Sequence, residues 1–338
     1  MSKKHNKSVT SFDVAQQAGV SRSMVSRAYT DGAKISNESR KKVYEAAEKL
    51  GYRVNYLARG LQTRQSNLVG IVASALDTPF RARQVKMAAR EFIRQGYRPM
   101  LMVAETPDEV EQLISLLFSY NVAGMLITSA TPSSEIIVES NNLSVPVVLI
   151  NRETEIVGPD KVQIDIQQAG KLAFDMLIRS GAKNLAVVRP VSPSFSVTGR
   201  SDAFVQHCSE NGYSAQVFNA ASQSYDSGFE VAGKIGLALD RIDGLFCTTD
   251  LLAIGVMDRL RADWNVDIPN GLQIVGFDDI EQAKWGSYQL STIRQDAKEQ
   301  ACAAVDLMLD RIENPDRDPK IYLQTVVPIF RNTTQKSQ

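Results

Sequence analysis

The sequence predicts a small all-α head, joined by a short linker to a larger α/β body made of two similar lobes. Three observations support this fold class. Apolar residues in the first fifty positions recur with the period of an amphipathic helix. From Asn67 onward, short apolar strand runs alternate with helical segments, which is typical of parallel sheets covered by helices. This alternation starts again near residue 166, so the body divides into two lobes, and 338 residues suffice for such a chain.

Charge is unevenly distributed, although the net charge is zero. Residues 1–66 hold 13 Lys and Arg against 5 Asp and Glu, and the remaining residues hold 25 against 33. A basic head on an acidic body is typical of a nucleic-acid-binding module joined to a separate module. Basic side chains release counterions from DNA phosphates, so we expect DNA affinity to fall steeply with salt.

Composition argues against several other classes of protein. Residues 1–7 are polar, without the apolar region of a secretory signal, and no stretch is long and apolar enough to cross a bilayer. We therefore expect a cytoplasmic protein with no membrane partner. The cysteines are scattered and the chain has 2 histidines, so we expect reduced thiols, no metal, no cofactor and no catalytic residue.

The head is organised around two short helical segments within Thr10–Ala28. Thr10 can cap the first segment with Asp13 as its acidic partner, and Gly19 suits the left-handed residue that ends a helix. Ser21 can cap the second segment. This pattern predicts a helix-turn-helix, whose second helix lies in the DNA major groove; the alternative is an ordinary helical hairpin with a solvated polar face. The candidate DNA-contacting residues of the head are Thr10, Ser21, Arg22, Ser23, Ser26, Arg27 and Lys34.

A third helix and a linker follow. Ser36 can cap a helix that runs to about Leu50 and is closed by Gly51. Residues 55–66 can form a short helix, but Gly60 in its interior costs about 1 kcal/mol relative to alanine, so we expect it to fold only when something holds it. Leu61 either wedges into a minor groove or packs on the following domain.

The body is predicted to bind its ligand between the lobes, because parallel α/β sheets bind ligands at the carboxyl ends of their strands. Strand runs are predicted at 68–73, 100–104, 124–128 and 145–150 in the first lobe, and at 184–189, 215–218, 244–248 and 272–277 in the second.

Several motifs together carry a family resemblance. They are Asp13-Val-Ala-x-x-Ala-Gly-Val-Ser21 with Val25-Ser-Arg27, Leu50-Gly-Tyr52, Asn55-x-x-Ala-Arg59-x-Leu61, Val275-Gly-Phe-Asp-Asp279, Leu290-Ser-Thr-Ile-Arg-Gln-Asp296 and Arg331. With them, the chain resembles the lactose/galactose repressor family of bacterial transcription regulators along nearly its whole length.

The resemblance implies a helix-turn-helix head at 1–53, a hinge helix at 54–66 and a two-lobed core like that of periplasmic binding proteins. It also implies a homodimer on a pseudopalindromic double-stranded DNA operator, with the two hinge helices in the central minor groove. Val54 departs from the proline that usually precedes Asn55 in this family, which suggests a looser linker. The implied hinge contacts are Asn55, Ala58, Arg59 and Leu61; the implied N-terminal lobe is 67–165 with 296–322, and the C-terminal lobe is 166–295 with 323–338.

The resemblance also implies an effector cleft formed by Phe80, Asn151, Arg200, Thr249 and Asp278. Phe80 offers a stacking face, Arg200 a planar fork for a carboxylate, phosphate or hydroxyl pair, and Asp278 an acceptor for hydroxyls. Lobe packing is the alternative role for Phe80, and a turn or cap for Asp278. Thr249 stands where the family commonly has asparagine, and Ala297 where an aromatic residue can occur.

Arginines near predicted strand ends suggest the hypothesis of an anionic effector, such as a sugar acid or phosphosugar. The alternative is that they are solvated surface residues. They are Arg81, Arg83, Arg152 and Arg189.

Two other classes of protein share such a body. An enzyme is disfavoured because no Gly-rich phosphate loop follows the first strand and no GxSxG motif occurs. A periplasmic binding protein is disfavoured by the basic head and the polar N-terminus. We therefore expect a sequence-specific DNA-binding transcriptional regulator, a repressor whose operator affinity is controlled by a sugar or sugar-acid-like effector. The polar, aperiodic C-terminus favours a dimer over a tetramer.

Overall fold

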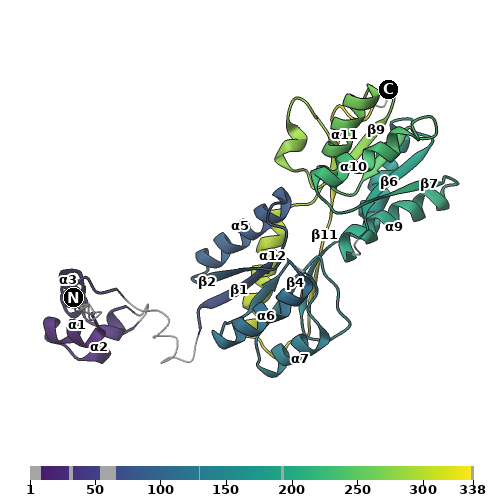
Figure 1. Ribbon diagram of the computed structural model, residues 1–338. Coiled ribbons are helices and arrows are strands. Elements are labelled where there is room, and N and C mark those ends of the chain that lie inside the picture. The colour runs from purple at the N-terminus through teal and green to yellow at the C-terminus, as the bar shows by residue number, and fades with distance from the viewer. Residues whose placement is uncertain (1–8, 30–32, 54–65, 129, 192–193, 336–338) are drawn as a thin grey trace, which may run out of the picture. The chain divides into compact units, whose positions relative to one another are not determined.

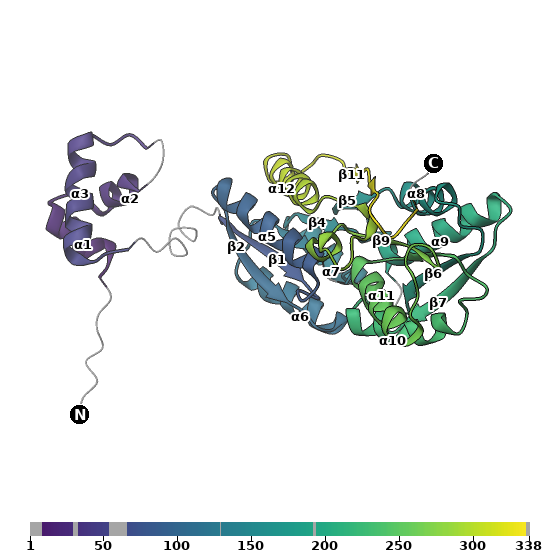
Figure 2. The ribbon, with the colours of Figure 1, turned by 90° about the horizontal axis from the view of Figure 1, so that it is seen from above.

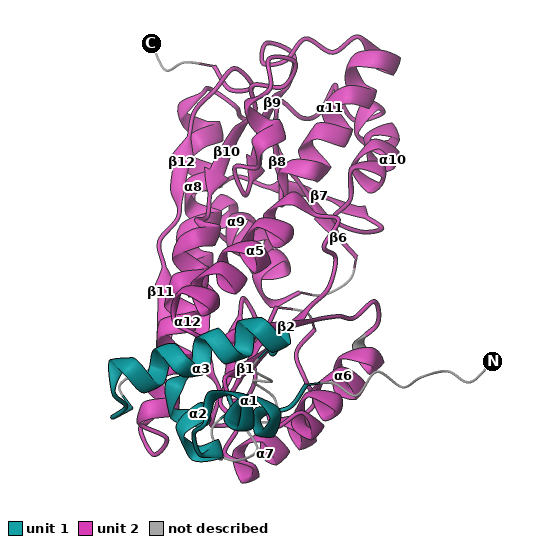
Figure 3. Ribbon diagram, turned by 90° about the vertical axis from the view of Figure 1, so that its left-hand side faces the viewer, with its two compact units in different colours: residues 1–66 teal, residues 67–338 magenta. Residues whose placement is uncertain are grey.

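The computed structural model describes residues 9–29, 33–53, 66–128, 130–191 and 194–335. It divides the chain into two compact units, residues 1–66 and 67–338 (Figure 3). The division falls where the sequence predicts the end of the linker. No helix within these described ranges is long and apolar enough to cross a membrane.

The first unit is a three-helix bundle around a small apolar core. Val14, Val25 and Val43, one from each helix, are at most 1% exposed. The Tyr44 hydroxyl donates a 2.8 Å hydrogen bond to the carbonyl of Ala28, which ties the third helix to the second. The helices are α1 (Ser11–Ala18), α2 (Arg22–Ala28) and α3 (Asn37–Leu50), drawn in purple in Figure 1.

The predicted signals at the helix ends are present in the first unit. The Asp13 carboxylate accepts hydrogen bonds of 2.7 Å from both the backbone N–H and the hydroxyl of Thr10. Gly19 ends α1 with a left-handed φ of 66°. The Ser21 hydroxyl accepts a 3.3 Å hydrogen bond from the N–H of Met24, which opens α2. These bonds satisfy backbone groups that a helix end otherwise leaves unpaired.

The N-terminal lobe of the second unit is a parallel sheet between two layers of helices. Its strand order is β11-β5-β4-β3-β1-β2, and all neighbouring pairs are parallel. Apolar side chains of α5 and α12 pack on one face, and those of α6 and α7 on the other (Figure 1). The elements are β1 (Leu68–Ala73), α5 (Pro79–Arg94), β2 (Arg98–Val103), α6 (Pro107–Ser119), β3 (Met125–Ile127), α7 (Ser134–Asn142), β4 (Val147–Ile150), β5 (Asp160–Ile164), α12 (Ala297–Glu313) and β11 (Ile321–Gln324).

The C-terminal lobe repeats this architecture. Its strand order is β12-β10-β9-β8-β6-β7, with β12 antiparallel to β10 at the edge. Helices α8 and α9 pack on one face, and α10 and α11 on the other. The elements are α8 (Ile166–Arg179), β6 (Leu185–Pro190), α9 (Phe195–Glu210), β7 (Ala215–Ala220), α10 (Tyr225–Gly236), β8 (Gly244–Cys247), α11 (Asp250–Trp264), β9 (Gln273–Phe277), the 3-10 helix η1 (Glu281–Lys284), β10 (Ser291–Arg294) and β12 (Val327–Ile329).

The chain passes between the two lobes at three places. The first follows β5 at residue 165, the second follows β10 at 295–296, and the third follows β11 at 325–326. Strand β11 lies beside β5 in the N-terminal lobe, as Figure 2 shows. The lobe boundary predicted between 322 and 323 therefore falls inside β11, and the crossing comes after Gln324.

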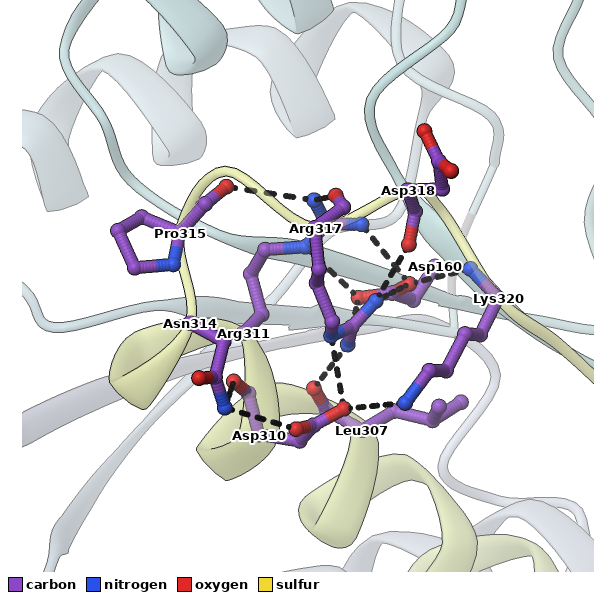
Figure 4. A network of polar contacts seen from close by, with 9 residues as sticks. All are labelled: Asp160, Leu307, Asp310, Arg311, Asn314, Pro315, Arg317, Asp318 and Lys320. Atoms are coloured by element: carbon purple, nitrogen blue, oxygen red, sulfur yellow. Dashed lines mark hydrogen bonds and ion pairs between the residues drawn. The ribbon is translucent and has the colours of Figure 1, made fainter.

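A buried ion cluster fastens the end of α12 to the start of β5 (Figure 4). Asp160 is 1% exposed. Its carboxylate accepts hydrogen bonds from Arg317 at 2.8 and 2.9 Å, from Arg311 at 3.1 and 3.2 Å, and from the N–H of Lys320 at 2.7 Å. Burial acts to raise the pKa of Asp160, but these donors outweigh it and hold the pKa below its ordinary value.

Candidate functional site

The polar face of α2 is the candidate DNA-reading surface of the first unit. Val25 and Ala28 are buried, whereas the predicted contact residues of α2 and its cap are all exposed. Arg22 and Ser23 stand at the N-terminal end of α2, the end that leads into the major groove in helix-turn-helix proteins. The exposed residues are Thr10, Ser21, Arg22, Ser23, Ser26, Arg27 and Lys34.

Some basic residues of the bundle form ion pairs with acidic residues of the bundle, and others do not. Lys42 on α3 pairs with Glu38 at 2.7 Å, and Lys41 lies 3.8 Å from Glu45. Arg22 forms no ion pair with any residue of the described ranges. Its charge is therefore available to DNA. The predicted hinge contacts Asn55, Ala58, Arg59 and Leu61 lie outside the described residues.

A pocket between the two lobes of the second unit is the candidate effector site. It lies at the carboxyl ends of strands from both sheets, and its space of about 610 Å³ includes open solvent at its mouth. The structure brings together all the predicted effector residues. Phe80, Asn151, Arg200, Thr249 and Asp278 all line it.

Two lining residues owe their positions to unusual backbone at strand ends. Asn151 directly follows β4 with a φ of 53°, and Asp278 directly follows β9 with a φ of 118°. Positive φ values are uncommon for residues other than glycine and concentrate at binding sites. The Asn151 carboxamide oxygen accepts a 3.1 Å hydrogen bond from the N–H of Ile164, which fixes this side chain against β5.

Phe80 and Thr249 have structural roles as well as pocket positions. Phe80 lies in the first turn of α5 in the N-terminal lobe, yet it packs against the apolar core of the C-terminal lobe. Thr249 caps α11, where its hydroxyl accepts a 3.4 Å hydrogen bond from the N–H of Leu252. The packing alternative therefore holds for Phe80 alongside its place in the lining, and Thr249 combines its place in the lining with a capping role that the sequence did not suggest.

A buried network of amides connects the pocket to the interlobe crossings. Gln295, at the second crossing, donates a 2.6 Å hydrogen bond to Asp278. Gln300 donates to Gln295 at 2.9 Å and to Gln324, beside the third crossing, at 2.8 Å. Gln84 of α5 donates to Gln300 at 2.5 Å. Asp278 is therefore connected through hydrogen bonds to residues at the second and third crossings between the lobes.

Arg200 is a buried cation that donates no hydrogen bond to any of the described residues. It projects from α9, is 2% exposed, and its guanidinium carbon lies 3.9 Å from the centre of the Phe277 ring. Its Nε and Nη1 atoms have no partner among the described residues. Burial lowers its pKa to about 10, although Asp278 and Asp250 oppose this shift, so the group remains charged at neutral pH.

Arg81 and Arg152 form a second cationic group on the N-terminal lobe. Both donate to the carbonyl oxygen of Thr128, Arg152 at 3.1 Å, and Arg152 also donates to the carbonyl of Asn151 at 2.7 Å. Burial lowers the pKa of Arg81, and burial together with the charge of Arg81 lowers that of Arg152 to about 9. Both residues belong to the set of arginines that the sequence suggested.

The other two suggested arginines do not reach the pocket. Arg83 is exposed and borders, with Lys86, a surface groove that adjoins the pocket. Arg189 pairs with Asp202 at 2.5 Å. Further lining residues were not predicted from the sequence. Two of them could have been found there, because Thr128 directly follows β3 and Gln295 lies within the 290–296 motif. The others include Gln84, Ser194, Ser196, Val197, Gln223, Leu251 and Ile280.

Asp278 is the one acidic side chain among the described lining residues. Burial raises its pKa to about 6, although Arg200, a hydrogen bond from Gln295 and the charge of Arg81 act against this. Asp250 is fully buried and accepts hydrogen bonds from Thr292 at 2.6 Å and the N–H of Ile280 at 2.9 Å. Burial, together with the neighbouring charge of Asp278, raises the pKa of Asp250 well above its ordinary value.

Two family models match the chain. Residues 12–55 match the model described as bacterial regulatory proteins, lacI family, and residues 174–334 match that of a periplasmic binding protein-like domain. The chain belongs to the lacI family. It is 29% identical to the ribose operon repressor of Bacillus subtilis (strain 168) over 328 residues, which cover 96% of this chain and 98% of the relative. It is 28% identical to catabolite control protein A of Priestia megaterium, with 97% and 99% covered.

Solved structures of lacI-family proteins share the fold. The lac repressor dimer bound to operator and the anti-inducer ONPF matches with a TM-score of 0.87 at 22% identity, over 98% of this chain and 100% of that chain. A lacI-family regulator from Enterococcus faecium with bound ribose matches with a TM-score of 0.72 at 23% identity, over 79% and 98%. The predicted helix-turn-helix head and two-lobed core with parallel sheets are thus confirmed. As a lacI-family member, the protein is a DNA-binding transcription regulator rather than an enzyme.

Proposed function

We propose that this lacI-family protein is a repressor that binds a pseudopalindromic operator as a homodimer, in the cytoplasm, under the control of a sugar or sugar-acid-like effector. The observation that carries the proposal is the interlobe pocket, in which all five residues predicted for the effector meet. The names of the relatives support it, since one is a ribose operon repressor and one structure holds ribose.

The pocket has the chemistry of a polyol site. Asp278 accepts hydrogen bonds from hydroxyls, and Arg200 donates to their oxygens. Phe80 lines the pocket and packs against the core of the C-terminal lobe, and it supplies an apolar face for a sugar ring. Such a few polar groups converging in a cleft are typical of small-molecule sites.

Effector binding acts on DNA affinity through the angle between the lobes. A ligand that touches Asn151 and Asp278 bridges the lobes, and both side chains hydrogen-bond to Gln295 at the second crossing. In a dimer, a change of this angle alters the distance between the start of one subunit's core, at residues 66 and 67, and the same residues of the other subunit. That distance determines whether the two marginal hinge helices can pack together. A few kcal/mol suffice to shift such a population, and the coupling is reciprocal. The effector either releases or promotes operator binding.

Base reading is assigned to the polar face of α2. Arg22 is the first candidate for direct readout, because a guanidinium can donate two hydrogen bonds to one guanine. Leu61 and its neighbours in the hinge would then bind the minor groove at the operator centre.

Gel retardation with the DNA region upstream of its own gene tests the proposal. We expect retardation that weakens steeply with salt, and a change in it on adding at least one compound from a panel of sugars, sugar acids and sugar phosphates. Arg22→Ala should reduce operator affinity about tenfold to a hundredfold, while the control Lys49→Ala, at the exposed end of α3, should change it much less. No retardation at any salt concentration would refute the proposal.

A further inference from the structure

One buried side chain, that of Gln300, joins the effector pocket to the crossings between the lobes. Gln300 lies near the start of α12 and is 0% exposed, and it is not among the described residues that line the pocket. From its hydrogen bonds we propose that Gln300 is a positioning residue, through which a ligand in the pocket changes the angle between the lobes. This inference rests on the proposed function, because it names the device by which the same pocket regulates operator binding.

The Gln300 carboxamide uses its whole hydrogen-bonding capacity. Its nitrogen donates to the side-chain oxygens of Gln295 at 2.9 Å and Gln324 at 2.8 Å. Its oxygen accepts from the side-chain nitrogens of Gln84 at 2.5 Å and Asn151 at 3.4 Å. A carboxamide has two N–H donors and an oxygen with two lone pairs, so these four bonds fill it. A side chain held by four partners turns only when several of them move with it.

Three of the four partners face the effector pocket. Gln84, Asn151 and Gln295 all line it, and they come from α5, from the end of β4 and from the second crossing. Sugar hydroxyls both donate and accept hydrogen bonds, so a sugar competes for the amide groups that bind Gln300. In a buried network, where no water replaces a lost partner, each bond affects its neighbours. A ligand that binds these amides therefore changes the bonds of Gln300.

The fourth partner, Gln324, ties the three crossings together. It ends β11 immediately before the third crossing and is 0% exposed. Its side-chain nitrogen donates a 3.1 Å hydrogen bond to the carbonyl of Asp296 at the second crossing. Its backbone carbonyl accepts a 2.9 Å hydrogen bond from the N–H of Asp165 at the first. Because Gln300 fixes the Gln324 side chain, a change at the pocket reaches all three crossings through this one residue.

Hydrogen–deuterium exchange of the full chain, followed by mass spectrometry, tests whether Gln300 holds the crossings. Gln300→Met keeps the length of the side chain but removes all four hydrogen bonds. We expect backbone exchange to become about fivefold faster or more at residues 165, 295–296 and 325–326 together. If Gln300→Met does not fold by circular dichroism, Gln324→Met takes its place, because it removes the bonds that join the second and third crossings.

Gln273→Met is the matched control. Gln273 of β9 is also a buried glutamine, 5% exposed, and its side chain donates a 2.9 Å hydrogen bond to the carbonyl of Ser180 rather than to the network. We expect Gln273→Met to lower the melting temperature as Gln300→Met does, but to change exchange at the crossings less than about twofold. The comparison separates loss of a buried hydrogen bond from loss of the connection.

Added sugar and operator DNA test the regulatory role. In wild type, we expect millimolar ribose, glucose or gluconate to change exchange at the crossings and operator retardation. In Gln300→Met both effects should be about fivefold smaller or less, and in Gln273→Met they should match wild type. A residue that only stabilised the core would lower the melting temperature without altering this response.

Three results would overturn the inference. They are equal effects of the two variants on exchange, faster exchange confined to the start of α12, and an undiminished response to sugar in Gln300→Met. Failure of the proposed function has a different signature, since it is absence of retardation by the full chain at any salt concentration. The exchange comparison between the two variants needs no DNA and no sugar, so it decides the role of Gln300 at the crossings in that case as well.

Discussion

Two clusters of buried arginines in the second unit differ in whether the protein supplies their counter-charge. In one, Arg311 and Arg317 share the carboxylate of Asp160 (Figure 4). In the other, Arg81 and Arg200 line the interlobe pocket, and two nitrogen atoms of Arg200 have no partner in the described part of the chain. Both clusters occupy similar sites between secondary-structure elements. The difference indicates that the paired cluster holds the fold together and that the unpaired cluster is kept for a ligand.

The physical basis of this difference is desolvation. A guanidinium taken out of water loses several kcal/mol of hydration, which a carboxylate with good hydrogen bonds can offset. Asp160 supplies that offset in every state of the protein. In the pocket, Asp278 is the one carboxylate among the described lining residues, and it forms no hydrogen bond with Arg81 or Arg200. A ligand that supplies acceptors to these two arginines therefore gains binding free energy.

Removing the shared carboxylate should have the largest effect. Asp160→Ala leaves Arg311 buried without its counter-ion and Arg317 with only Asp310 at 2.7 Å, so we expect the free energy of unfolding of the second unit to fall by about 3–5 kcal/mol. Urea denaturation followed by tryptophan fluorescence measures this, since Trp264 and Trp285 both lie in the second unit. The control Asp316→Ala changes the exposed residue next to Arg317, and its free energy of unfolding should stay within about 0.5 kcal/mol of wild type. Equal losses in the two variants would contradict a structural role for the cluster.

Replacing one arginine of each cluster by methionine should give effects of opposite sign. Arg317→Met removes hydrogen bonds to Asp160 and should destabilise the second unit by about 2–3 kcal/mol. Arg200→Met replaces an unsatisfied buried cation by an apolar side chain of similar length, so it should stabilise the ligand-free protein by about 1–2 kcal/mol. The same denaturation measurement, in a buffer without phosphate or carboxylate ions, checks both. Destabilisation by Arg200→Met would mean that the pocket charge is already neutralised.

The sequence predicts the strands whose apolar runs are continuous, and it misses those that depend on distant partners. Strand β5 interleaves Asp160, Lys161 and Gln163 with apolar residues, and it pairs with β11, about 160 positions later. No local pattern identifies such a pair. Asp160 is separated from Arg311 and Arg317 by 151 and 157 positions, so the sequence does not predict the paired cluster either.

The candidate site is easier to predict from the sequence than strands β5 and β11, because several pocket residues directly follow buried strands. Asn151 and Asp278 are found in this way. The state of the arginines is less predictable. Arg81 and Arg83 lie two positions apart on α5 and differ only in helix phase, yet one lines the pocket and the other faces solvent. Which arginine stays unpaired depends on packing between lobes, which a single sequence does not encode locally.

The two carboxylates should also give opposite pH dependences, with the smallest effect of the three predictions. Asp160 has a lowered pKa in the folded protein, so its contribution to stability is present above its ordinary pKa near 4 and is lost as pH falls below it. Asp278 has a pKa raised to about 6, so its contribution is present below about pH 4 and is lost as pH rises through 6. We expect wild type to lose about 1–2 kcal/mol relative to Asp278→Asn between pH 4.5 and 7, and melting temperatures across this range in buffers that do not bind the pocket measure the difference. Asp316→Asn should follow wild type.

Because protonation of Asp278 removes the pocket's own carboxylate, gluconate should bind more tightly at pH 5.5 than at 7.5, and Asp278→Asn should lose this dependence. Parallel curves for wild type and Asp278→Asn would show that the pKa of Asp278 is not raised in the folded protein.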